Sequence, residues 1–433
     1  MNNILDNFFG ITKLGSNIRT EIFAGVSTFL ALSYIFVVNP AILSSAGMNK
    51  SGVFFATVVG SVITTLAMGL WANKPFAVAP GLEMNAYMAY VVVGVLGFTW
   101  QGALGAVFWS GVLTVLLSFT SLRVGIINAI PNKLKFGLSA AVGVFLMLIA
   151  LKVSSLFLYE GIRLKGIGVL FSNQAFVFYL GLVLAAVLKY FKVRGSILLS
   201  IIGASILAHI CGLSNAIEPI KFSKEIFSGT FSLDLVIILN PKIWSVVLIL
   251  FILDFYGSIA KFIGLTQNTP IVDAQGNLPK LKEALIVDGA GTVLGATLGT
   301  SNLITYVESA VGIGEGGRTG LVAVVCAILM SLFLFLTPLL NFVPALAATG
   351  ALFFVGLTLL PWKEVNKQYD LAEWLSILVT IVVTIWTFGL DKAMFAGFIS
   401  FVVLKLLIGK FREINKYLIV STLLLGISMW LSR

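Results

Sequence analysis

The sequence predicts an all-α membrane protein with about fourteen transmembrane spans, arranged as two inverted repeats of seven. Of the 433 residues, 59% are hydrophobic and only 11% are charged, and the mean hydropathy is +1.05. Apolar stretches of about 20 residues, the length that crosses a bilayer, recur along the chain. Two of these stretches, 76–85 and 298–307, are interrupted by Gly or Pro at matching positions of the two halves.

The apolar stretches set the predicted spans. With the N-terminus in the cytoplasm, the cytoplasmic loops hold more than twice as many Lys and Arg residues as the opposite loops, as the positive-inside rule requires. The spans cover residues 20–38, 51–71, 76–96, 100–121, 134–156, 174–192, 195–213, 242–263, 283–297, 298–316, 319–339, 343–361, 371–389 and 391–409. A shorter apolar segment, 416–431, either lies on the surface or packs as an additional helix.

A polar interruption at 214–241 divides the spans into two sets of seven. An odd number of spans in each half inserts the second half upside down relative to the first, which is typical of transporters. The first half begins near Thr20 and the second near Lys242, an offset of about 222 residues. The same offset carries residues 76–85 onto 298–307, so the two interrupted spans, three and ten, correspond.

Each interrupted span is predicted to be a short extended segment followed by a half-helix, because irregular backbone within a membrane is tolerated only where it is buried in protein or lines a cavity. In span three, the break at Pro80 is followed by Glu83 and Asn85. In span ten, a polar run precedes Glu308, and the half-helix is expected to start near Thr305.

Acidic residues lie inside predicted spans at Glu83, Asp254, Asp288 and Glu308. An acid at this depth is costly and marks an ion or substrate pathway, although each could instead cap a half-helix or pair with a neighbouring span. For Asp288, which opens a helix of small residues, a packing role is an equal alternative. Burial favours the protonated form of a carboxyl group, so these four acids are candidates for proton coupling.

Other classes of protein fit the sequence poorly. The net charge of +10 comes from basic residues scattered between apolar spans, which excludes a nucleic-acid-binding face. The single His209 and the two cysteines, Cys211 and Cys326, lack the spacing of a metal site or a disulfide framework, so no metal or cofactor is expected. The loops hold no nucleophile–base arrangement, and we therefore do not expect an enzyme.

Four stretches resemble the nucleobase:cation symporter family, in the adenine/guanine/hypoxanthine (purine) permease branch of the xanthine/uracil permease superfamily. They are TEIFAGVSTFLALSYIFVVNPAILSSAGM (20–48), APGLEMNAYMAY (79–90), DGAGTVLGATLGTSNLITYVESAVGIGEGGRTGL (288–321) and GFISFVVLKLLIGKFREI (397–414). The resemblance implies proton-coupled import of purine bases across the inner (plasma) membrane by alternating access.

The resemblance also implies two domains and a homodimer formed through one of them. A core domain, 20–121 and 242–339, would move against a gate domain, 134–213 and 343–409. Substrate would bind between spans three, eight and ten. The substrate-binding residues expected on this basis are Glu308, Asn85, Glu83, Asp254, Ser258, Thr305 and Asn302.

The chain departs from the family pattern at two positions. The second acid of the family's span-eight motif is Gly257 here, and a small residue of its span-three motif is Glu83. We hypothesise that Glu83 takes over part of the role of the missing acid. The departures leave a uracil- or xanthine-type carrier as an alternative, with sodium as an alternative coupling ion. An anion carrier of the same fold is disfavoured because Glu83 and Glu308 lie at the breaks.

Overall fold

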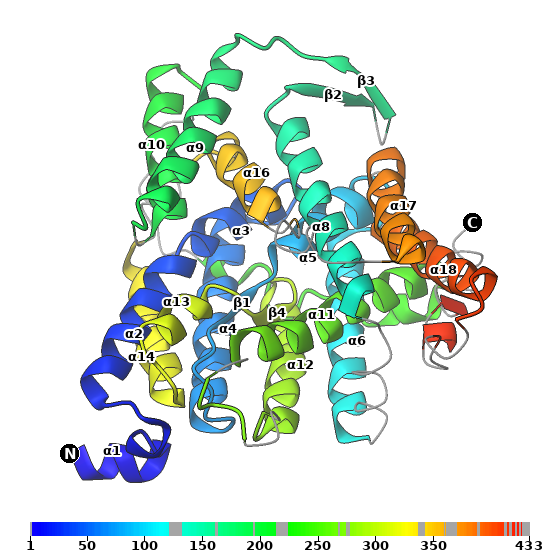
Figure 1. Ribbon diagram of the computed structural model, residues 1–433. Coiled ribbons are helices and arrows are strands. Elements are labelled where there is room, and N and C mark those ends of the chain that lie inside the picture. The colour runs from blue at the N-terminus through cyan, green and yellow to red at the C-terminus, as the bar shows by residue number, and fades with distance from the viewer. Residues whose placement is uncertain are drawn as a thin grey trace.

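The computed structural model of the chain is a bundle of helices with two short two-stranded sheets (Figure 1). Strands β1 and β4 lie where spans three and ten were predicted to contain short extended segments, whereas the sheet of β2 and β3 departs from the predicted all-α chain. The structure describes residues 2–120, 132–160, 163–193, 195–213, 224–266, 269–273, 278–336, 343–358, 360, 370–387, 390–410, 414, 418–420, 422–423 and 426. Most of the additional segment predicted at 416–431 thus lies outside the described residues.

The helices and strands follow the predicted spans closely. In the first half they are α1 (Asn2–Phe9), α2 (Ile18–Leu32), α3 (Ile35–Ser44), α4 (Lys50–Leu70), β1 (Val78–Pro80), α5 (Leu82–Ala86), a π-helical segment (Tyr87–Val93), α6 (Trp100–Phe119), α8 (Asn132–Val153), β2 (Phe157–Glu160), β3 (Arg163–Ile167), α9 (Asn173–Tyr190) and α10 (Ser196–Ile210). In the second half they are α11 (Ile243–Thr266), α12 (Leu281–Leu298), β4 (Leu303–Thr305), α13 (Ser309–Gly314), α14 (Gly320–Ser331), α16 (Thr349–Thr358), α17 (Leu371–Thr387) and α18 (Leu390–Leu407).

The described helices include four that are long and apolar enough to cross a membrane. They are Ile18–Ser44, Lys50–Leu70, Trp100–Phe119 and Asn173–Tyr190, and several shorter apolar helices accompany them. Each of the fourteen predicted ranges contains a helix, while the number of bilayer crossings stays a prediction.

The hairpin of β2 and β3 lies in a stretch that was expected to be a loop. The two strands pair antiparallel, with Phe157 opposite Ile167. Helix α8 ends at Val153, before the predicted end of its span, and the chain continues as β2. Strands of four and five residues give too short an alternation of apolar and polar side chains to identify the hairpin in so apolar a sequence.

Strands β1 and β4 lie side by side near the centre of the bundle (Figure 1). They pair antiparallel, with Val78 opposite Thr305 and Pro80 opposite Leu303. Their backbone groups are satisfied far from either end of the bundle, which buried irregular chain requires. Antiparallel pairing is also what a two-fold axis between corresponding segments of the two halves produces.

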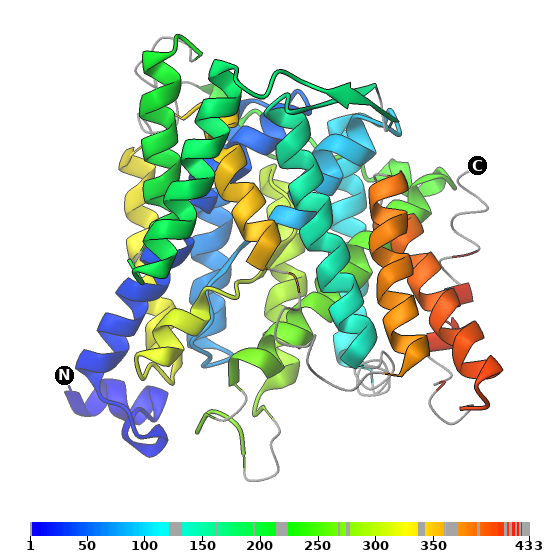
Figure 2. The ribbon, with the colours of Figure 1, turned by 45° about the horizontal axis from the view of Figure 1, so that its top comes forward.

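The helices pack into two groups (Figure 1 and Figure 2). Helix α12 packs on α4 and α6, α14 packs on α2 and α4, and α11 packs on α6. In the second group α9 packs on α10, α16 packs on α8 and α9, and α17 packs on α8 and α18. The strand pair β1–β4 belongs to the first group through its contacts with α4 and α12.

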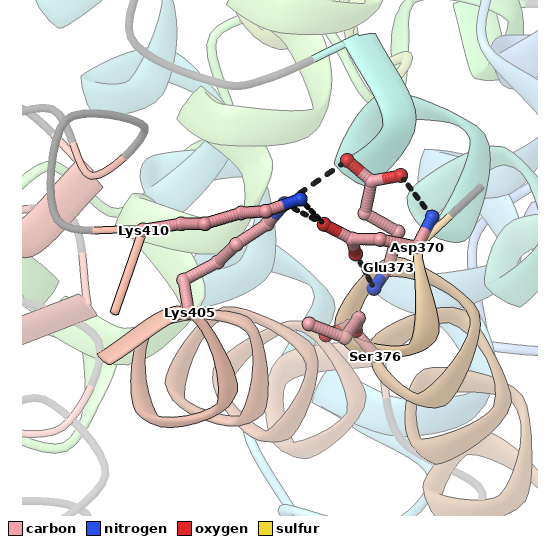
Figure 3. Close-up of polar contacts among 6 residues, drawn as sticks. Asp370, Glu373, Ser376, Lys405 and Lys410 are labelled. Carbon is pink, nitrogen blue, oxygen red and sulfur yellow. Dashed lines mark hydrogen bonds and ion pairs between the residues drawn. The ribbon is translucent and has the colours of Figure 1, made fainter. Parts of the chain in front are cut away.

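Helices α17 and α18 are joined by a cluster of charged side chains at one end of the pair (Figure 3). Lys405 of α18 is fully buried and its ammonium group binds the carboxylates of Asp370 and Glu373, the latter at 3.2 Å. Glu373 and Asp370 also exchange backbone N–H···O bonds of 3.0 Å, which is a reciprocal cap on the start of α17. Lys410 binds Asp370 from the more exposed side at 3.0 Å.

Helices α4 and α14 approach closely at Gly69 and Gly320. A Cβ atom at Gly320 would lie 1.9 Å from the carbonyl oxygen of Gly69, and small residues allow such close approach of membrane helices. We expect Gly320→Ala to lower the free energy of unfolding by about 1–3 kcal/mol, because the helices must separate. The measurement is the melting temperature of the detergent-purified protein. Gly166→Ala, where a Cβ would meet no described atom within 4 Å, is the control; equal melting temperatures for the two variants would contradict the assignment.

Candidate substrate site

The paired strands are tied to their surroundings by side chains from three other segments. The Thr65 hydroxyl of α4 donates to the Val78 carbonyl oxygen and accepts from the Val78 N–H, both at 3.0 Å. The Ala77 N–H donates to the Ser309 hydroxyl at 3.0 Å, and the Tyr306 hydroxyl donates to the Pro80 carbonyl oxygen at 2.5 Å. The interruption in the first half is therefore fixed by Thr65 of the same half and by Ser309 and Tyr306 of the second half.

Glu308 lies between the end of β4 and the start of α13, and its side chain is half-buried. The Tyr34 hydroxyl donates to Glu308 Oε1 at 2.8 Å. Tyr34 itself is buried between α2 and α3. The half-helix begins at Ser309, so the prediction of a start near Thr305 is wrong: Thr305 is still in β4, paired with Val78.

Asp254 of α11 is fully buried and is held by side chains from two other segments. The Thr292 hydroxyl donates to Asp254 Oδ2 at 2.8 Å, and the Asn302 side-chain amide donates to the same oxygen at 3.1 Å. Asn302 also donates to the Ser110 hydroxyl of α6 at 3.1 Å. Within the described residues, Asp254 Oδ1 and Asn302 Oδ1 have no hydrogen-bond partner, so both oxygens can still accept a bond.

Asp288 of α12 is fully buried and holds β4 in place. The Thr305 hydroxyl donates to Asp288 Oδ1 at 2.9 Å, and the Thr305 backbone N–H lies 3.4 Å from Oδ2. A carboxylate that binds both the side chain and the backbone of one strand residue fixes the position of that strand. The geometry therefore favours the structural alternative considered for Asp288 over direct contact with a ligand.

Asn85 of α5 is buried and joins the two interruptions to each other. The Ser301 hydroxyl donates to Asn85 Oδ1, while Asn85 Nδ2 has no partner among the described residues. An amide whose oxygen is occupied and whose nitrogen is unpaired can donate to an acceptor atom of a ligand.

Glu83, in the first turn of α5, is half-buried and reaches α11. Its Oε1 lies 3.8 Å from Lys261 Nζ. Gly257 precedes Lys261 by about one helical turn, and a Cβ there would meet no described atom within 4 Å. Ser258 of α11 is buried beside it. Glu83 thus contacts α11 at Lys261, about one helical turn after Gly257, and its replacement of the missing acid stays a hypothesis.

Lys261 supplies positive charge to the whole group of acids. It pairs with Glu83 and exerts an electrostatic attraction on Asp254, Asp288 and Glu308. The predicted site residues therefore gather where α5, α11, α12 and β4 meet. The sequence reasoning missed Tyr34, Ser110, Thr292 and Ser301 as their partners. Ser301 lies in the polar run before Glu308. The other three lie in apolar helices or between them, where the sequence gives no indication of their contacts.

Paired strands from the two halves, surrounded by buried acids within a multi-pass helical bundle, define a membrane transporter. The transmembrane domain of the cyanobacterial bicarbonate transporter BicA has a similar fold, with a TM-score of 0.63 at 16% identity, covering 88% of this chain and 97% of that one. The transporter SLC26A9 gives a TM-score of 0.67 at 13% identity and covers 94% of this chain and 69% of that one. At such low identity the likeness shows the fold alone.

The chain belongs to the Permease family, which matches residues 19–383. Adenine permease AdeP of Escherichia coli is 34% identical over 422 residues, covering 97% of this chain and 95% of AdeP. Guanine/hypoxanthine permease PbuO of Bacillus subtilis is 31% identical, covering 98% of this chain and all of PbuO. Relatives with these names support the purine nucleobase permease branch and a transporter rather than an enzyme.

Proposed function

We propose that this protein imports purine bases of the adenine, guanine or hypoxanthine type across the inner (plasma) membrane, driven by protons. The observation that carries the proposal is the half-buried Glu308 at the junction of β4 and α13, held by the Tyr34 hydroxyl. A carboxyl group in this position accepts an N–H from a flat heterocycle when ionised, and carries a proton when neutral. The relatives with purine-permease names support this choice of substrate.

We divide the site residues into those that contact the substrate and those that carry the proton or position other groups. Glu308 and Glu83 are half-buried, so we assign them to the N–H groups of the base. Asn85, with its unpaired amide nitrogen, is assigned to an acceptor atom of the base. Asp254 and Asp288 are fully buried; we assign Asp254, which has an unpaired oxygen and is held by Asn302, as a candidate proton carrier beside Glu308, and Asp288 to fixing Thr305.

We propose that transport occurs by alternating access, in which two domains move relative to each other. We infer a core domain of α2–α6 and α11–α14, which carries the site, and a gate domain of α8–α10 and α16–α18. The packing of the helices into two groups supports this division. So does a small cleft lined mainly by apolar side chains, including Val38 and Ile42 of α3 and Leu352 of α16, where the two groups meet.

Neutralisation couples the proton to this movement. An uncompensated charge is expensive to move past apolar surface. The core domain therefore crosses the gate surface once protonation of Glu308 or Asp254, together with bound substrate, has removed excess negative charge. We infer fourteen spans with the second seven inverted, and the antiparallel β1–β4 pair supports the inversion. The excess of Lys and Arg in one set of loops supports a cytoplasmic N-terminus.

Uptake of radiolabelled base into cells that lack their own purine carriers tests the function. We expect adenine, guanine or hypoxanthine to accumulate and to compete with one another, while sulfate has no effect. A protonophore should collapse accumulation, and removal of sodium should leave it unchanged. Uptake of uracil or xanthine alone would contradict the purine assignment, and sodium dependence would contradict proton coupling.

A further inference from the structure

The ion pair between Glu83 and Lys261 has an unusual geometry for a salt bridge. The two charged atoms are 3.8 Å apart, and the side chains are 19% and 21% exposed. This separation allows Coulomb attraction but is too long for a hydrogen bond. The pair therefore has unused capacity on both sides: the carboxylate can accept and the ammonium can donate. On the same helix as Lys261, a Cβ at Gly257 would meet no described atom within 4 Å.

The two groups come from different helices, which fixes their order in space. Glu83 is carried by α5 directly after strand β1, and Lys261 is carried by α11. One acceptor and one donor at fixed positions form a complementary pair for a ligand edge that presents one donor and one acceptor on adjacent atoms. A ligand bound in the same orientation, but with the opposite order of groups on its edge, would place its acceptor against the Glu83 carboxylate and its donor against the Lys261 ammonium group.

Purine bases differ in this order. A 6-oxopurine presents an N–H donor at position 1 next to a carbonyl acceptor at position 6. A 6-aminopurine presents an acceptor at position 1 next to an N–H donor at position 6. We propose that the Glu83–Lys261 pair is the specificity-determining element that distinguishes these two orders, an inference that rests on the proposed import of purine bases. Lys261 then has a second role beyond balancing the charge of Asp254, Asp288 and Glu308.

A charge-swapped variant separates recognition from simple charge balance. E83K/K261E keeps one positive and one negative group in the same places but reverses donor and acceptor. We expect the ratio of KM values for adenine and hypoxanthine to shift by roughly ten-fold or more toward the base that the unmodified protein disfavours. If the pair only balances charge, the swap changes uptake of both bases equally and leaves the ratio unchanged, which overturns the proposal.

Single substitutions decide the matter if the swapped variant does not fold. K261Q and E83Q each remove one charge, and we expect each to bring the KM ratio closer to one. K242Q, an exposed lysine just before α11, is the matched control and should keep the original ratio. A single variant that lowers uptake of both bases with an unchanged ratio overturns the proposal. Failure of the underlying function is seen separately, because the unmodified protein then takes up neither base.

Discussion

Glu308→Ala is expected to reduce uptake of purine bases to background, a loss of at least about 100-fold in kcat/KM. The substitution removes the half-buried carboxylate that accepts from Tyr34 at 2.8 Å, and with it both the acceptor assigned to the substrate and one candidate proton carrier. A hydrogen bond to a charged group contributes about 1.5–3 kcal/mol, and a factor of ten corresponds to about 1.4 kcal/mol. Initial rates of uptake into cells that lack their own carriers give the measurement.

Two further variants separate binding from coupling at this position. Glu308→Gln keeps the size and one acceptor oxygen but holds no proton, so we expect base exchange to persist while accumulation against a gradient is lost. Tyr34→Phe removes only the hydroxyl group, and we expect a smaller loss, about 3- to 10-fold, equivalent to one hydrogen bond. Concentrative uptake by Glu308→Gln that a protonophore still collapses would exclude Glu308 as the proton carrier and leave Asp254.

Lys405→Met is expected to lower the free energy of unfolding by about 3–5 kcal/mol, the cost of removing one partner of a buried ion pair. Lys405 is fully buried between α17 and α18, and Glu373 is only 3% exposed (Figure 3). Without the ammonium group, the carboxylates of Asp370 and Glu373 lose the buried cation that they share. Unfolding by sodium dodecyl sulfate in mixed micelles measures the change.

Lys410→Met is the matched control for Lys405→Met. The Lys410 side chain is 43% exposed, and an exposed pair contributes about 0–1 kcal/mol. An equal loss in the two variants would show that burial of Lys405 is not the source of its effect. Adding Glu373→Gln to Lys405→Met should recover part of the stability, because the buried Glu373 carboxylate, which has lost Lys405, is then replaced by a neutral amide.

The cluster should also resist moderate acid. Burial alone would raise the pKa of Asp370, but hydrogen bonds from Lys405 and Lys410 outweigh it and hold that pKa well below its usual range. A lowered carboxyl pKa gives stability that is complete above the ordinary value and is lost only as the pH falls through the folded-state value. The stability that ionised Asp370 adds to the unmodified protein should therefore be the same at pH 7 and pH 5, as measured by the difference in unfolding free energy between the unmodified protein and Asp370→Asn.

Much of the site could be predicted because polar residues are conspicuous in an apolar chain. Glu308, Asp254 and Asn302 stand out against long apolar stretches, since a polar group at that depth needs a reason to be there. The Gly and Pro residues around Pro80 and Gly299 likewise locate the irregular backbone. The position of buried polar residues and of irregular backbone could therefore be predicted from the sequence.

The sequence did not predict which residues far apart in the chain contact each other. Tyr34 lies between the apolar helices α2 and α3, and Thr292 lies within α12, where nothing in the sequence distinguishes them, yet Tyr34 binds Glu308 and Thr292 binds Asp254. Lys405 lies near the end of the predicted span 391–409, and from the sequence it indicates only which side of the membrane that end faces. In the structure it is a buried partner of two acids.

The sequence by itself determined the apolar spans, the two interruptions and the acids within them, because hydrophobicity and backbone irregularity are local properties. Only the tertiary structure decided which acid meets which partner: Glu83 with Lys261, Asp288 with Thr305, and β1 with β4. These contacts join residues up to about 225 positions apart. They depend on how helices cross, and side-chain packing across many spans sets that crossing.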